Sequence, residues 1–283
     1  MLNDNELKAM VSLLDDEDRE VVNMIEKQIF SLGETIIPFL EEEWTRQFNP
    51  LVQKRIELLL HSLNFNLVKQ RLANWVKNEQ DDLLKGMWAV ATYQFPDLKL
   101  ETLREHIQEI YYDTWRDLRD DLHPSDQISI LNNIFFNQYK FKPNAANFNA
   151  VANSMLNTVL ETKKGNPITL CVIYLLVAQK LKLPIYGVNL PNLFVLTYKT
   201  EQQTFYINVF NKGLIFMRAD IDNYIQQLRL NHNDMFYQPC SHLDIIRRVL
   251  RNLIVSYEKL NDSEKLQEVK QLLTDVLGDK VGN

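Results

Sequence analysis

The stretch that most constrains the fold of this chain is residues 165–184, GNPITLCVIYLLVAQKLKLP. Asn166 suits a helix N-cap, and Pro167 suits the first helical position, where a missing N–H costs nothing. Apolar side chains follow on nearly every face, so we expect a helix that is buried on all sides. The apolar run stops at Gln179 and Lys180, short of the roughly 20 residues that a bilayer requires. The sequence therefore predicts the central helix of a soluble domain.

Cys171 lies near the start of this predicted helix. The positive end of a helix dipole lowers the pKa of a thiol and favours the thiolate, so this is a suitable place for a nucleophile. A free cysteine is also among the most frequently buried residue types, and Leu170 and Val172 flank this one. We expect burial to outweigh the helix dipole and to keep the thiol protonated.

Composition narrows the possible partners and compartments. The 283 residues are 46% hydrophobic and 24% charged, which is typical of one or two globular domains. A net charge of -6 offers no basic face for nucleic acid or anionic lipid, so neither is expected as a partner. Two cysteines, Cys171 and Cys240, form no disulfide framework or zinc motif. With no secretory signal visible at the start, a cytoplasmic protein is expected.

Helical spacing of apolar residues dominates the first hundred residues. We expect helices over residues 18–32, 34–46, 50–63, 66–76 and 80–93, followed by a longer one over 100–122. The phrase VVNMIEKQIFSLGETIIPFLEEEW resembles one HEAT-type helix pair. The acidic run Glu41–Glu43 points in several directions on a helix and has no histidine beside it, so no metal or cofactor site is predicted.

The pattern changes after Pro184. The segments IYGVNL, LFVLTY, TFYINVF and GLIFM are short, rich in β-branched and aromatic residues, and separated by turn residues, which predicts four antiparallel strands. Helices are expected again over 220–230, 242–260 and 263–277. The fold class is therefore α+β, with a helical region over 1–100, a core over 101–240 in which the cysteine helix packs on the sheet, and a C-terminal helical hairpin over 241–283.

The segment from Asn153 to Asn208 resembles the bacterial SirB-type branch of the transglutaminase-like superfamily, whose papain-like core has the same order of parts. That branch reads, in outline, NSxLNxVLxxRxGNPITLxxxYLxVAxxLxLPxxGVNxPGHFLLRY and then YIDPFNGG. The matching residues, too dense for chance, are Asn153, Ser154, Leu156, Asn157, Val159, Leu160, Gly165, Asn166, Pro167, Ile168, Thr169, Leu170, Gly187, Val188, Asn189, Pro191, Phe210, Asn211 and Gly213.

The resemblance implies a cysteine nucleophile, a histidine base and an acidic residue that orients the histidine. Carried over position by position, the nucleophile falls on Cys171, the histidine is replaced by Leu193, and the acidic residue is replaced by Asn208. An amide could still orient an imidazole, but an isobutyl group neither accepts nor donates a proton. If the alignment of the strands is right, these three side chains should converge.

Histidines elsewhere are poor substitutes for the missing base. His61 and His106 lie in predicted helices, His123 lies in a turn before a helix over 126–137, and His232 and His242 follow the predicted sheet. None of them occupies the strand position that the family uses. Each is expected to be a surface or turn residue.

Two hypotheses about function follow. The first is a non-catalytic transglutaminase-like protein, a pseudoenzyme that acts as an interaction or regulatory module with a protein partner. The second is a thiol enzyme that uses Cys171 for acyl transfer or for hydrolysis of an amide or isopeptide bond. Leu193 favours the first, because function depends on the site and not on the fold.

Overall fold

The computed structural model describes residues 3–119 and 121–278. Its internal contacts divide the chain into two compact units, Met1–Arg71 and Leu72–Asn283. The division falls within one long helix, α4, and not near residue 100 where the sequence had suggested a boundary. The C-terminal helices belong to the second unit together with the sheet.

The first unit is all helical, as expected. It contains α1 (Asp4–Ser12), α2 (Arg19–Ser31), α3 (Ile37–Arg46) and the first part of α4 (Pro50–Asn78). Its apolar core is built from side chains on all four helices, among them Val11, Ile25, Leu40 and Ile56. Helix α1 was not predicted. Asn3 and Glu6 cap its start reciprocally, which is a capping box.

Helix α4 corrects the prediction of two helices with a break at Asn64. The helix runs without interruption through Asn64 because Leu59, Leu63 and Val68 are all buried on it. An isolated Asn has only a weakly unfavourable helix propensity, and packing on both sides of it overrides that preference. A HEAT-like repeat stays a prediction.

The second unit begins with helices that surround the centre of the fold. They are α5 (Leu83–Ala91), α6 (Leu100–Asp117), α7 (Pro124–Asn132) and α8 (Leu156–Thr162). Helix α6 ends earlier than predicted, at Asp117, and α7 begins earlier, at Pro124, because the His123 side chain caps it by accepting from the Ser125 N–H. A wider, π-helical turn, Asn133–Gln138, continues α7.

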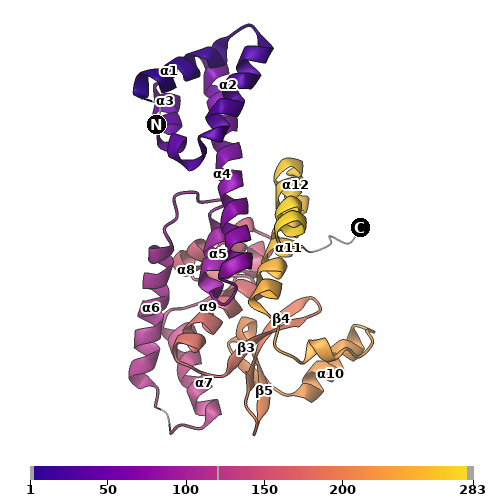
Figure 1. Cartoon of the computed structure of the whole chain (residues 1–283). Coiled ribbons are helices and arrows are strands. Elements are labelled where there is room, and N and C mark those ends of the chain that lie inside the picture. Colours follow the sequence, from indigo (N-terminus) through magenta and orange to yellow (C-terminus); the bar gives the residue numbers. More distant parts are fainter. Residues whose placement is uncertain (1–2, 120, 279–283) are drawn as a thin grey trace. The chain divides into compact units, whose positions relative to one another are not determined.

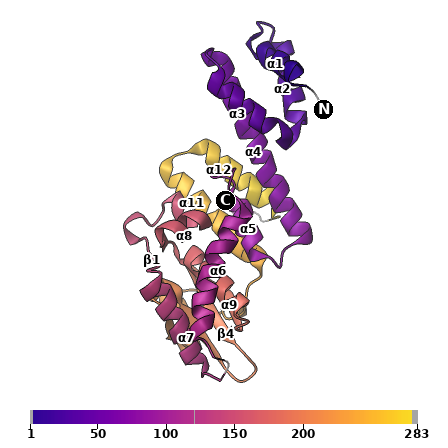
Figure 2. The same cartoon turned by 90° about the vertical axis from the view of Figure 1, so that its left-hand side faces the viewer.

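The predicted central helix is α9 (Pro167–Lys180), and its eleven residues Ile168–Ala178 are all buried. Figure 1 shows it next to β3 and β4, and Figure 2 shows it beside α6 and α8; it contacts all four elements. The sequence therefore located the centre of the fold correctly.

The four predicted strands form one antiparallel sheet in the order β3-β4-β5-β6. Their bounds are β3 (Ile185–Leu190), β4 (Leu193–Lys199), β5 (Thr204–Asn208) and β6 (Leu214–Phe216). A second, two-stranded parallel pair, β1 (Lys142–Pro143) with β2 (Lys164–Gly165), was not predicted, because two residues are too few for a periodic pattern. The mixed helical and sheet class is confirmed.

Helices cover both faces of the sheet. On one face, α10 (Arg218–Gln227) packs through Ile221 and Ile225 on Val188 and Val195 of the sheet. On the other face lies α9. The last helices are α11 (His242–Leu260) and α12 (Ser263–Gln271), which contact each other across a turn at Asn261. A wider, π-helical turn, Leu272–Val276, follows α12.

Candidate functional site

The start of α9 is held by a buried network of polar side chains. The Asn166 side chain accepts a hydrogen bond from the Thr169 backbone N–H (3.0 Å) and donates one to Ser154 Oγ (3.0 Å). Asn166 is therefore the expected N-cap, and its second hydrogen bond ties the helix to the loop before α8. Pro167 follows at the first helical position.

The buried side chain of Asn153 fixes the conformation of that loop through three hydrogen bonds. Its Nδ2 donates to the carbonyl oxygens of Asn147 (2.7 Å) and Phe148 (2.9 Å), and its Oδ1 accepts from Asn144 Nδ2 (2.8 Å). Buried amides of this kind satisfy backbone groups that would otherwise lose their hydrogen bonds to water. The motif residues Asn153, Ser154 and Asn166 thus fix the start of α9 and the loop before α8 through hydrogen bonds.

Cys171 is completely buried, at 0% exposure. Its Sγ donates to the backbone carbonyl of Phe194 at 3.5 Å, and the backbone N–H of Val209 is a second polar neighbour. Burial raises the pKa of the Cys171 thiol well above its ordinary value, and the N–H of Val209 lowers it by less. The expected direction of this shift is confirmed, so the thiol is protonated at neutral pH.

Leu193 and Asn208 lie together in a different place. Both line a pocket of about 230 Å³ whose other walls include Ile221 and Tyr224 of α10. The Asn208 side chain also accepts a hydrogen bond from the Asn211 backbone N–H at 3.1 Å, which shapes the turn after β5. Cys171 is not among the residues that line this pocket.

The strand register explains the separation. Leu193 pairs with Leu190, which packs in the same cluster as Ile221 on the α10 face. Successive strand residues point to opposite faces, so Phe194 points the other way, where it lines a cavity together with Pro167 and Ile168 of α9. Leu193 and Asn208 thus line one pocket together without Cys171, and this lining does not support the expected convergence of all three side chains.

The backbone groups that interact with the sulfur belong to the next residues along the chain, Phe194 and Val209. A shift of one residue reverses the face to which a strand side chain points, which accounts for the difference from the expectation. Neither Phe194 nor Val209 has a titratable side chain. The titratable group that acts on the sulfur is the Cys240 thiol, whose charge would raise the pKa of Cys171 further.

Histidines do not reach the thiol either. The ring nitrogens of His106, His123 and His242 contact Thr102, Ser125, Gln80 and Gln179. His232 stacks on Tyr237 and lies 3.8 Å from Asp234. His61 belongs to α4 in the first unit.

A cavity of about 260 Å³ at the start of α9 is lined in part by an arginine of α11. Arg248 of α11 lines this cavity with Asn166 and Asn192 and donates to Asn189 Oδ1 at 2.9 Å. Burial lowers the pKa of Arg248 from its ordinary value. In the sequence, the one indication that Arg248 is partly buried is its position next to Val249, beside the apolar stripe of α11. Among the described residues, no group of acidic, histidine and cysteine side chains could hold a metal ion.

A scan against protein families matches residues 101–251, more than half of the chain, to the family described as "Transglutaminase-like superfamily". The chain belongs to the transglutaminase-like superfamily. The matched region extends from α6 into α11 and includes α9 and the whole four-stranded sheet. The resemblance of the motif residues to this superfamily is confirmed, whereas the SirB-type branch and the roles of the three substituted positions stay predictions.

Relatives of this transglutaminase-like chain occur in bacteria and mammals. A "UPF0162 protein" of Pasteurella multocida is 32% identical over 106 residues, which are 38% of this chain and 40% of the relative. A "UPF0162 protein" of Xylella fastidiosa is 26% identical over 206 residues, which are 66% of this chain and 68% of the relative.

The mammalian relative is a longer protein. "F-box only protein 21" of Mus musculus is 27% identical over 161 residues, which are 54% of this chain and 25% of the relative. The transglutaminase-like chain thus spans well under half the length of some relatives. No solved structure matches it significantly. No helix in the described ranges is both long enough and apolar enough to cross a membrane.

Proposed function

We propose that this chain is a non-catalytic transglutaminase-like protein that acts as an interaction or regulatory module for a protein partner in the cytoplasm. The observation that carries the proposal is the closed environment of the thiol. Cys171 Sγ is fully buried and its hydrogen bond goes to the backbone of Phe194. A thiol must lose its proton before it can attack an acyl carbon, and no described side chain is placed to take that proton.

The two other carried-over positions support the same proposal. Leu193 cannot exchange a proton with a substrate, and the amide of Asn208 already accepts from the Asn211 N–H. Acyl transfer also needs a group that protonates the leaving amine. The pocket of Leu193 and Asn208 lies on the α10 face, so neither residue can do this for a substrate at Cys171.

Mass spectrometry of the folded chain tests the proposal directly. The full chain is incubated with a glutamine-containing peptide thioester, and a parallel sample is incubated with iodoacetamide. We expect no acyl adduct on Cys171, and we expect alkylation of Cys171 only after unfolding in guanidinium, since protein interiors exclude the reagent.

Cys240 provides the internal control. It is only partly buried, although burial raises its pKa to about 12. In native protein it should react with iodoacetamide before Cys171 does. An acyl adduct on native Cys171 that is absent from the Cys171→Ala variant would overturn the proposal and support a cysteine-dependent acyl transferase or an amide or isopeptide hydrolase.

A further inference from the structure

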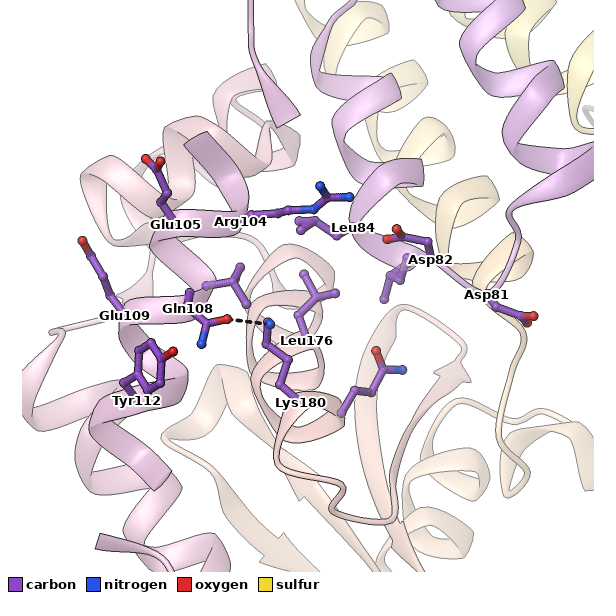
Figure 3. Close-up of a pocket in the computed structure, with 13 residues that line it drawn as sticks. Asp81, Asp82, Leu84, Arg104, Glu105, Gln108, Glu109, Tyr112, Leu176 and Lys180 are labelled. Carbon is purple, nitrogen blue, oxygen red and sulfur yellow. Dashed lines mark hydrogen bonds between the residues drawn. The ribbon is translucent and has the colours of Figure 1, made fainter. Parts of the chain in front are cut away.

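A groove of about 900 Å³ lies beside α6 in the second unit, and the α9 residues that line it belong to the second half of that helix, after Cys171. Its floor is apolar and consists of Leu83 and Leu84 at the start of α5, Ile107 of α6 and Leu176 of α9. Figure 3 shows α6 on one side of this groove and the start of α5 on the other. The groove takes no part in the site described above.

Acidic side chains line both rims of the groove. Glu105 and Glu109 are exposed on the α6 rim. Asp81 and Asp82 lie on the opposite rim, next to α5 (Figure 3). Within the described part of the chain, Asp81 and Glu105 make no ion pair with a basic side chain. Their charges are therefore available to a partner.

The two basic residues of the groove already have partners. Arg104 is paired with Glu101 at 2.6 Å. Lys180 donates to Gln108 at 2.7 Å, the contact drawn between α9 and α6 in Figure 3, and lies 5.5 Å from the centre of the Tyr111 ring. Carboxylates outnumber cations on the lining, so the field in the groove favours a cationic occupant.

An exposed aromatic pair extends the groove along α6. Tyr112, which lines the groove, is 59% exposed, and Trp115, one helical turn further on, is 61% exposed. Large aromatic side chains that remain exposed next to an apolar groove are typical of interaction surfaces, because they bury much area at small entropic cost. They would receive apolar side chains of the occupant.

We infer that this groove binds a basic amphipathic helix of a partner protein. The apolar face of such a helix would lie on Leu84, Leu176 and Tyr112, and its Lys or Arg side chains would reach the carboxylates on the two rims, which is the helix-in-groove mode of recognition. The inference rests on the proposed function, since it names the surface through which the module would act. It does not use Cys171.

The probe is a fluorescein-labelled synthetic peptide of about 15 residues, long enough for a marginally stable helix, with leucines at i, i+3, i+4 and i+7 and lysines on the opposite face. Binding to the full chain is measured by fluorescence anisotropy. Two comparison peptides carry glutamates in place of the lysines, or the same residues in scrambled order. We expect each to bind at least about tenfold more weakly than the basic amphipathic peptide.

Substitutions of exposed residues test whether the peptide binds in the groove, and they leave the core unchanged. Tyr112→Ala should weaken binding of the basic peptide about tenfold, as expected for a central aromatic contact. Tyr186→Ala is the matched control, because Tyr186 is 44% exposed on β3 of the same unit. Glu105→Lys with Glu109→Lys should also weaken binding, whereas Glu201→Lys in the turn before β5 should not.

Equal affinity for the basic, acidic and scrambled peptides would overturn the inference, as would undiminished binding to the Tyr112→Ala variant. Tighter binding of the acidic peptide would show that Arg104 and Lys180 dominate the groove and would overturn it as well. The proposed function fails by a different result, an acyl adduct on Cys171. The two failures are therefore distinguishable.

Discussion

Burial determines the chemistry of the single residue Cys171. A thiol inside a core loses the hydration that stabilises its charged form, so its pKa is higher in the folded chain than in the unfolded one. The unfolded chain then ionises first as the pH rises above the ordinary thiol value of 9.0, and it binds fewer protons than the folded chain. The contribution of the buried thiol to the free energy of unfolding is therefore fully present below that pH and is lost as the pH rises above it.

The first prediction follows from this direction of the pH dependence of stability. In the wild-type chain, the buried thiol should lower the free energy of unfolding by about 1 kcal/mol between about pH 9 and 10. Cys171→Ala should remove that part of the decline. Guanidinium denaturation of both proteins at the two pH values measures the difference, in which the titration of groups remote from Cys171 cancels. Equal declines would show that the Cys171 thiol is already ionisable in the folded chain.

Restoring the family's residues should not restore activity. We expect Leu193→His with Asn208→Asp to fold, because both side chains are only partly buried, and to form no acyl adduct on Cys171. The new imidazole and carboxylate would face each other on the α10 side of the sheet, away from the sulfur. Mass spectrometry after incubation with the peptide thioester checks this, and a thermal melt confirms folding. An adduct found only in the double variant would refute the assignment of faces.

Among the secondary-structure elements, α9 owes part of its stability to the side chain that caps its first turn. Asn166 is buried and holds both the Thr169 N–H and Ser154 Oγ, so its loss would leave two buried polar groups without a partner. Ser241 caps α11 in the same way through the Asp244 N–H, but it is exposed, and water can replace it.

This contrast gives the third prediction. Asn166→Ala should lower the free energy of unfolding by about 2 to 3 kcal/mol, whereas Ser241→Ala should lower it by about 1 kcal/mol or less. Chemical denaturation of the two variants and the wild type provides the values. Similar costs at the two caps would mean that the Ser154 contact contributes nothing to the stability of α9.

The elements that the sequence predicted well are those whose patterns are local. Near-continuous apolar residues identified α9, and β-branched runs between turn residues identified β3 to β6. Asn64 misled the prediction for α4, since only tertiary burial of Leu63 and Val68 reveals that the helix continues.

Placing the candidate site needed more than local pattern. The motif identified Cys171, Leu193 and Asn208 as positions of interest, but the face to which each strand residue points depends on the register of β4. The acidic groove was missed for a related reason. Its walls come from α5, α6 and α9, and no single amphipathic pattern links residues that are so far apart in the sequence.

At the scale of the whole molecule, the division into two units assigns the end of α4 to the second unit. Trp75 shows why this assignment is physically reasonable. Its side chain is 1% exposed, its Nε1 donates to the Asp82 carbonyl at 2.8 Å, and its ring lies so close to Gly86 that an added Cβ there would approach it to 2.8 Å. The last turns of α4 are thus part of the core that α5 also enters.

The last prediction tests that assignment by truncation. A fragment that begins at Leu72 retains Trp75, α9, the sheet and α11, which is ample apolar core for an independent domain, and it should unfold in one cooperative transition. A fragment that begins at Leu83 loses Trp75, and removal of a large buried aromatic side chain costs about 3 to 5 kcal/mol. Circular dichroism melts of the two fragments should therefore differ by at least about 5 °C in Tm. Identical melts would place Trp75 outside the folding unit, and failure of the longer fragment to fold would show that the second unit needs the first.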